Sequence, residues 1–394
     1  MSTCATASRD LDEPVAGTAA TARTWLLLEQ SGPWGAKALT SSHLDPELGR
    51  ALEAAAEGTG VRVALIRRPG RHADCHDAAR RHVFAAHVDP ASPTTWLHSA
   101  VIDDPARLLQ LDFAALGKGD HHTFDHALDA APHTGAPLAL VCTNGKRDRC
   151  CALLGRPLAA ELTAAGEPGA WEVTHLGGHR FSPTLLVLPY GYAYGRVGAE
   201  EVRGVLAAAG EGRVVVDGCR GSSAWERPGQ AAELAVRRFS GEDRAGVLSV
   251  LRTEPARTES TRTGHSRTED SSTDEPRTED AAPTEDAPTD DSRGPEAAGP
   301  RWDVIVAHVD GRCWRVTVAQ GASLPPRPES CGAALATPGR MDVLAVRPEA
   351  PLPQAPGALA SAASAPAGKA DGKAEATGAT RYDPAAPVRD MDRL

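Results

Sequence analysis

The chain has 394 residues, a formal net charge of −10 at pH 7 and an aromatic content of only 4%. Residues 252–300 contain 13 acidic and six arginine side chains and therefore supply −7 of that charge, which leaves the rest of the chain close to neutral. A near-neutral body gives no case for nucleic-acid binding, and the first residues contain no apolar run that could act as a signal peptide or span a membrane. We therefore expect a cytoplasmic protein without nucleic-acid or membrane partners.

The hydrophobic pattern predicts a mixed α/β domain over residues 23–250. Short apolar runs at 25–30 and 61–68 are typical of buried strands, and between them a helix begins at Pro46 and ends at Gly58. A strand, a helix and a strand in this order indicate a sheet with parallel members. The same reasoning predicts further strands at 82–88, 94–102, 137–142, 171–175, 183–191 and 212–218, and helices at 151–165, 199–210 and 229–239.

The segments around this domain differ from it in composition. Residues 1–22 are small and polar and are predicted to be a disordered tail, and residues 251–300 are predicted to be an acidic disordered linker because they lack any apolar period. Residues 301–349 are predicted to contain a β-hairpin that turns at Asp310 and packs on the main domain, since one hairpin is too small to fold alone. Residues 350–394 form a predicted disordered tail rich in Ala and Pro.

Two pairs of residues carry the metal-binding chemistry of the sequence. Cys142 and Cys151 have eight residues between them, and His175 and His179 have three between them. Thiolate and imidazole are common ligands of iron and zinc, and four of them close a site. Cys142 is expected at the end of a strand and Cys151 at the start of a helix, where free N–H groups favour a thiolate. Without a signal peptide, eight cysteines indicate reduced thiols or metal ligation instead of a disulfide scaffold.

The residues near these ligands support a bound cofactor. Gly177 and Gly178 lie between the two histidines, where adjacent glycines disfavour a helix and let a bulky group approach the backbone. Basic side chains that flank the four ligands would offset the negative charge of two thiolates. They are Lys146, Arg147, Arg149 and Arg180.

These segments resemble the sucrase/ferredoxin-like family over roughly residues 24–240. The resemblance rests on LVCTNGKRDRCCALLG (140–155), HLGGHRF (175–181) and PYGYAYGRV (189–197), with weaker support from LLLEQSGPWGAKAL (26–39) and DGCRG (217–221). It implies a thioredoxin-like ferredoxin fold that holds a [2Fe–2S] cluster, with Cys142 and Cys151 on one iron and His175 and His179 on the other. Imidazole in place of thiolate raises the reduction potential of such clusters.

Several alternatives stay open at this point. Zinc could occupy the same four ligands, although eight residues between the cysteines is a poor match to zinc modules. Cys150 adjoins Cys151 and could be a ligand, a structural thiol or, with Cys151, part of a thiol oxidoreductase. Cys4 is expected to have no role, and Cys219 and Cys331 are expected to serve packing. Histidines at 72, 76, 82, 121, 122 and 126, and Cys75, are interpreted as polar surface residues.

The sequence therefore predicts an electron carrier more than an enzyme with its own substrate. Its expected cofactor is a [2Fe–2S] cluster, and its expected partner is a redox protein of unknown identity. Sucrase activity is not expected, because no pair of carboxylates stands out in the segments that carry the motifs. The sequence gives no indication of the oligomeric state.

Overall fold

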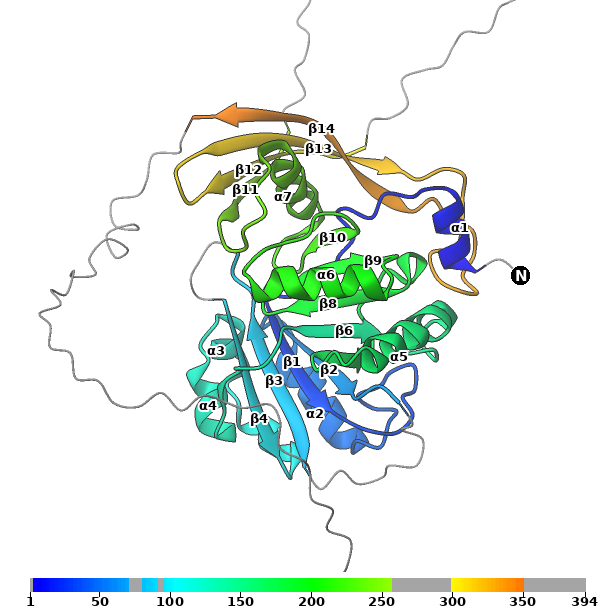
Figure 1. The fold of residues 1–394 in the computed structure, drawn as a ribbon, viewed down its shortest axis with the longest axis vertical. Helices are drawn as coiled ribbons and strands as arrows, with labels where there is room; N and C mark the ends of the chain where they lie inside the picture. Colours follow the sequence, from blue (N-terminus) through cyan, green and yellow to red (C-terminus); the bar gives the residue numbers. More distant parts are fainter. Residues whose placement is uncertain (1–2, 71–79, 91–94, 257–298, 351–394) are drawn as a thin grey trace, which may run out of the picture. The chain divides into compact units, whose positions relative to one another are not determined.

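A ten-stranded mixed sheet forms the centre of the structure (Figure 1), a computed structural model that describes residues 3–70, 80–90, 95–256 and 299–350. Its strand order is β10-β9-β8-β6-β7-β2-β1-β3-β4-β5. The strands are β1 (Thr24–Glu29), β2 (Val61–Arg67), β3 (Arg81–His87), β4 (Trp96–Ile102), β5 (Ala131–Pro132), β6 (Leu138–Cys142), β7 (Ala170–Val173), β8 (Thr184–Leu188), β9 (Tyr192–Gly195) and β10 (Cys219–Ser222).

The helices lie between these strands or beside them. The α-helices are α1 (Cys4–Asp10), α2 (Pro46–Ala56), α3 (Phe113–Gly117), α4 (His122–Leu128), α5 (Arg156–Ala164), α6 (Ala199–Gly210) and α7 (Arg227–Ser240). Short 3₁₀ turns cover Pro105–Gln110 and His179–Phe181. The start of α2 follows the expected chemistry, because Pro46 occupies its first turn and the Asp45 carboxylate accepts the N–H of Glu47 at 2.7 Å.

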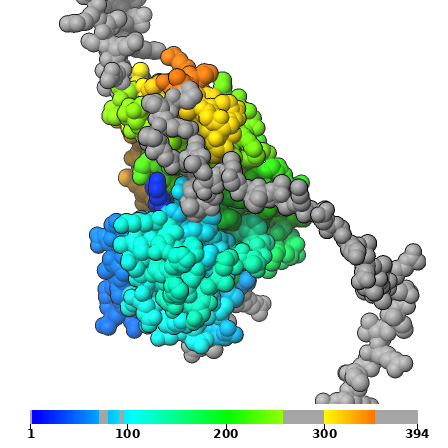
Figure 2. All heavy atoms as spheres, turned by 90° about the vertical axis from the view of Figure 1, so that its left-hand side faces the viewer, coloured from blue at the N-terminus to red at the C-terminus, as the bar shows by residue number. Residues whose placement is uncertain are grey.

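The sheet contains one structural pattern twice. In the first half, α2 joins the parallel strands β1 and β2, and β3 and β4 then add antiparallel beside β1. In the second half, α5 joins the parallel strands β6 and β7, and β8 and β9 add antiparallel beside β6. Figure 2 shows the first half (blue to cyan) and the second half (green) as neighbouring regions of the surface. The expected mixed α/β fold class is confirmed, and the single large sheet contains the pattern twice.

The halves join through their edge strands β2 and β7, which run antiparallel. Here the buried Arg67 and Glu172 form an ion pair at 2.7 Å, and the Thr143 hydroxyl donates to the same carboxylate at 2.8 Å. A buried carboxylate is tolerated only when it is paired and hydrogen-bonded in this way. The polar contact therefore fixes the register between the two halves.

Each half has its own hydrophobic core on one face of the sheet. Leu26 and Leu28 of β1 pack with Leu52 of α2, whereas Val141 of β6 packs with Leu158 of α5. On the opposite face, alternate side chains of both halves form a single shared cluster. This alternation follows from the two-residue period of a strand.

A second, four-stranded antiparallel sheet follows the large one. It contains β11 (Leu248–Pro255), β12 (Arg301–His308), β13 (Cys313–Ala322) and β14 (Gly339–Glu349). Its apolar face packs on α7, with Val304 and Val316 in one buried cluster with Val236. The predicted hairpin at Asp310 is β12–β13, and the small C-terminal β region is thus larger than the sequence indicated.

Three sequence predictions need correction. Residues 3–22 are not a disordered tail, because Cys4–Asp10 forms α1 and Cys4 and Ala5 are buried. Residues 212–218 are not a sheet strand. The N–H of Val214 instead donates to the carbonyl oxygen of Asp243, in the 243–245 loop, at 2.6 Å. The predicted acidic linker begins later than residue 251, because β11 continues to Pro255.

The rest of the predicted linker and the predicted C-terminal tail lie outside the described residues. Within the described part of the chain, the longest helix is α7 with 14 residues, and no helix there has the length and apolar character needed to cross a bilayer.

Candidate metal centre

The parallel strands β6 and β7 end side by side and bring the first predicted ligands to one edge of the sheet. Cys142 is the last residue of β6, pairs with Val173 at the end of β7 and is only 1% exposed. His175 follows two residues after β7 ends. The chain after β6 returns close to the strand because Gly155 has no side chain, and a Cβ atom there would collide with the carbonyl oxygen of Cys142. The strand register therefore determines where Cys142 and His175 lie.

Cys151 begins a five-residue π-helical turn that leads into α5. Its N–H donates to the carbonyl oxygen of Asp148 at 3.2 Å, and its Sγ lies 3.4 Å from the Sγ of Cys142. The Sγ of Cys150 lies instead 3.1 Å from the Sγ of Cys331. Single π-helical turns occur frequently at functional sites. The two adjacent sulfur atoms thus contact different neighbours, which does not favour a disulfide between Cys150 and Cys151.

Two glycines and two arginines shape the loop that carries the histidines. Gly177 and Gly178 both have left-handed backbone angles, with φ of 78° and 72°. The guanidinium of Arg62 donates to the carbonyl oxygen of His175 at 2.6 Å, and that of Arg220 donates to the carbonyl oxygen of Gly177 at 3.1 Å. These hydrogen bonds hold the backbone of the loop and therefore help to fix where the two imidazole rings lie.

The imidazole ring of His179 faces the Cys151 thiol through its Nδ1 atom, and the ring of His175 stacks on it. The rings of His175 and His179 stack with centroids 4.7 Å apart, and Nδ1 of His179 lies 3.2 Å from the Sγ of Cys151. Nδ1 of His175 is buried and has no hydrogen-bond partner. A buried polar atom without a partner costs free energy, so this nitrogen is suited to receive a ligand. We refer to Cys142, Cys151, His175 and His179 as the four-donor group.

The donors of this group spread over more space than one ion requires. Asp148, Cys151 and His179 each place a ligand atom within 4.8 Å of the others, and Cys142 and His175 lie outside that compact set. A tetrahedral zinc ion would need all four donor atoms within about 4 Å of one another.

Burial and close contact perturb the thiol and imidazole acidities. The hydrogen bond with Cys151 lowers the pKa of Cys142, which is also lowered by the neighbouring His175, whereas the contact with Cys142 raises the pKa of Cys151. Burial lowers the pKa of His179, which favours the neutral imidazole that can bind a metal.

Arg220 supplies the buried positive charge beside the four-donor group. Its side chain is 1% exposed, and its guanidinium also donates to the hydroxyl and the carbonyl oxygen of Thr18. Burial lowers the pKa of Arg220 to about 10, so the side chain stays charged at neutral pH. A buried guanidinium near the thiols offsets negative charge much more effectively than an exposed one.

The flanking basic residues have a different role from the one expected. Lys146, Arg147 and Arg149 are exposed. Arg180 is buried but forms ion pairs with Glu13 at 2.9 Å and Glu329 at 3.2 Å, so its charge is already matched. Sequence reasoning missed Arg62 and Arg220; the second lies within DGCRG, the segment that the family resemblance had already singled out.

The remaining histidines and cysteines lie elsewhere. His98 and His121 each place Nδ1 2.7 Å from an Asp125 oxygen, in a group whose ligand atoms are within 4.8 Å of one another. Cys219 and Cys313 are buried among apolar neighbours or in the β-hairpin. His72, Cys75 and His76 lie outside the described residues.

Comparison with known proteins gives one match. The family described as sucrase/ferredoxin-like matches residues 15–221, which is more than half of the chain. No curated protein and no solved structure matches the chain. The matched range contains the four-donor group, Arg62 and Arg220.

Proposed function

This chain belongs to the sucrase/ferredoxin-like family, and on that premise we propose that it binds a [2Fe–2S] cluster through the four-donor group and transfers single electrons. The observation that carries the proposal is the convergence of two buried thiols with the Nδ1 atom of His179, on whose ring that of His175 stacks, where β6 and β7 end. Cysteine and histidine are the ligands that iron–sulfur centres of the mixed type use.

The arrangement of the donors supports a cluster over a zinc ion. Cys142 and Cys151 lie together, and the two histidines lie together, as one pair of ligands for each of two irons would require. Zinc would need all four donors around one point. A single zinc ion is the second candidate, and it is the outcome that a metal assay separates most directly.

When bound, the cluster would supply one-electron redox chemistry, with a potential raised by its neutral imidazole ligands. The chain's own residues prepare the site for this. Arg220 places a fixed positive charge beside the thiols, and Arg62 and Arg220 hold the backbone of the histidine loop. Because Nδ1 of His179 faces the Cys151 thiol, Nε2 is the atom of this ring left to hold or release a proton. Electron transfer at this site would then depend on pH.

The test is to purify the full chain without oxygen, record its visible spectrum, and measure iron and acid-labile sulfide in the same sample. We expect a brown protein with equal amounts of iron and sulfide, and loss of the colour in His175→Ala and Cys142→Ser. Cys219→Ser is the matched control, because Cys219 is equally buried but lies in β10 away from the four-donor group. A colourless protein that cannot be reconstituted with iron and sulfide would overturn the proposal.

A further inference from the structure

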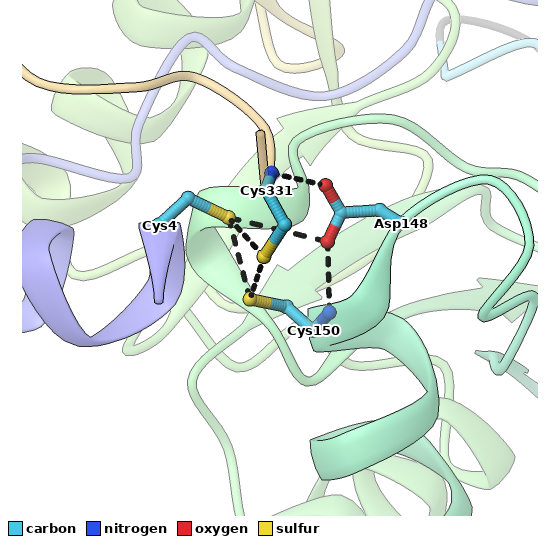
Figure 3. A group of neighbouring side chains, drawn as sticks. All are labelled: Cys4, Asp148, Cys150 and Cys331. Atoms are coloured by element: carbon cyan, nitrogen blue, oxygen red, sulfur yellow. Dashed lines mark hydrogen bonds between the residues drawn. The ribbon is translucent and has the colours of Figure 1, made fainter. Parts of the chain in front are cut away.

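A second group of sulfur atoms lies next to the four-donor group but apart from it. The Sγ atom of Cys150 is 3.3 Å from that of Cys4 and 3.1 Å from that of Cys331, and the sulfur atoms of Cys4 and Cys331 are 3.6 Å apart. An oxygen of Asp148 lies 4.0 Å from the sulfur of Cys4. Figure 3 shows the four side chains directed toward one another. We call these residues the three-thiol group.

The members of this group come from three distant parts of the chain. Cys4 is the first residue of α1, Cys331 lies in the loop between β13 and β14, and Cys150 immediately precedes the π-helical turn. Three separate segments must therefore be positioned correctly for the sulfur atoms to meet. Ordering three separate segments costs conformational free energy, so we do not attribute the convergence of the three thiols to chance.

Asp148 holds two of the three segments in place. One of its carboxylate oxygens accepts the N–H of Cys150 at 2.8 Å, and the other accepts the N–H of Cys331 at 2.8 Å. The oxygen that accepts the N–H of Cys150 also accepts the Cys4 thiol at 4.0 Å. The carboxylate is 3% exposed, and a buried carboxylate without a matching positive charge is costly. A cation among the three thiols would supply that charge.

The depth of the group fits a metal site better than a surface thiol cluster. Cys4 is 1% exposed and Cys150 is not exposed at all, and Cys331 is partly buried over them. The apolar neighbours that complete the cluster are Ala5 and Leu154. Apolar packing needs no thiol at three adjacent positions, whereas a metal ion does need three convergent donors.

We propose that Cys4, Cys150, Cys331 and Asp148 bind a structural Zn²⁺ ion. Thiolate is a soft ligand that selects zinc over Mg²⁺ or Ca²⁺, and a closed site of four protein ligands is typical of structural zinc. Around zinc, sulfur atoms lie about 3.8 Å apart, given Zn–S bonds of about 2.3 Å. The observed separations of 3.1–3.6 Å would need to widen by only a few tenths of an ångström. The thiol protons leave to solvent as the ion binds.

Such an ion would join the two ends of the described chain beside the four-donor group. It would tie α1 and the β13–β14 loop to the residue that precedes Cys151 in sequence. Metal binding to the folded chain alone stabilises it in proportion to the free metal concentration. The zinc proposal does not require iron in the four-donor group, although Asp148 also lies within 4.8 Å of ligand atoms of Cys151 and His179.

The experiment measures zinc per chain in the full-length protein, purified without oxygen and loaded with ZnCl₂ under reducing conditions. We expect a single tightly bound zinc ion that survives in Cys142→Ser and in Cys219→Ser but is lost in Cys331→Ser and in Cys4→Ser. Cys331 is the most accessible thiol of the group, so Cys331→Ser is the variant least exposed to a folding defect. X-ray absorption at the zinc edge should show three sulfur ligands and one oxygen ligand.

A thermal unfolding series keeps the test decisive if a variant folds poorly. Added ZnCl₂ should raise the Tm of wild-type protein and leave that of Cys331→Ser unchanged. Zinc that remains in Cys331→Ser, or that is lost only in Cys142→Ser, would overturn the proposal and place the ion in the four-donor group. A disulfide between Cys150 and Cys331 in zinc-free, anaerobically purified protein would also overturn it.

Discussion

The two sulfur-containing groups are built in opposite ways. The four-donor group is assembled from strand ends and one glycine loop inside the second half of the sheet, with loop backbone held by Arg62 and Arg220. The three-thiol group depends on segments that meet only when the whole described chain has folded, including α1 and the β13–β14 loop. The comparison shows that one group is built from segments close together in the sequence, whereas the other requires segments from both ends of the described chain.

The sharpest test of this comparison substitutes two neighbouring cysteines, one at a time. Cys151→Ser should abolish the visible spectrum and keep bound zinc, whereas Cys150→Ser should keep the spectrum and lose the zinc, because the two sulfur atoms contact different groups. Iron, sulfide and zinc are measured on both variants. Parallel loss of both metals in either variant would show that the two groups behave as one site.

A smaller effect is expected from the glycine loop. Gly178 has a φ of 72°, and a Cβ atom there would collide with the guanidinium of Arg220. Gly178→Ala should therefore destabilise the protein by about 1–3 kcal/mol and reduce its iron content. Gly177→Ala is the matched control, since it has a similar φ of 78° and no atom within 4 Å of the added methyl group. Denaturant unfolding of both variants gives the comparison, and equal losses would argue against a role for Arg220.

The third prediction concerns the buried charge beside the thiols. Arg220→Gln should lower the midpoint potential of the cluster, because removal of a buried positive charge makes the added electron less favourable. The expected change is on the order of tens of millivolts at the effective dielectric of a protein interior. Arg220→Lys should retain most of the potential. Redox titration followed in the visible spectrum measures it, and zinc content should not change in either variant.

The smallest effect is expected at the attachment of the C-terminal sheet, whose β13–β14 loop carries Cys331. Glu242 contacts Arg244 and the buried His308 of β12, and the hydrogen bond from Arg244 lowers the pKa of Glu242 to about 2. Because the folded pKa lies below the ordinary 4.5, this carboxylate stabilises the fold above that pH, and the contribution is lost as the pH falls toward about 2.

Metal-free wild-type protein should therefore lose more stability between pH 5 and pH 3 than Glu242→Gln does, by about 1 kcal/mol. Chemical unfolding at a series of pH values measures the difference. Identical pH profiles for the two proteins would show that Glu242 does not stabilise the attachment of the sheet. The attachment would then depend on apolar packing on α7.

The sequence was sufficient to predict the fold class and to single out the residues of the four-donor group, because their signals are local. Apolar runs such as 25–30 and 137–142 predict strands, and the residues of the four-donor group are close enough in sequence for a motif to find them. Cys4 and Cys331 carry no such signal. Their meeting depends on α1, which the composition of residues 1–22 did not predict, and on a loop far along the chain.

The repetition of one strand pattern within the sheet could not be predicted from the sequence either. The two halves share strand order but not sequence spacing, since 16 residues separate β1 from α2 whereas 13 residues, which include the π-helical turn, separate β6 from α5. Strand order follows from tertiary pairing, which a single sequence does not reveal. For the same reason the segment at 212–218 was wrongly assigned as a strand, because three consecutive valines fit a buried loop contact equally well.

The hydrogen bond from Arg62 to the carbonyl oxygen of His175 limits how the chain can be divided. Arg62 belongs to β2 of the first half, and Thr18, which receives Arg220, precedes that half altogether. All four candidate ligands lie between Leu138 and Phe181, yet the groups that orient them come from outside this span. A fragment that starts at β6 would contain all four candidate ligands but would lack the earlier residues that hold their loop in place. We therefore expect that the second half cannot form this site alone.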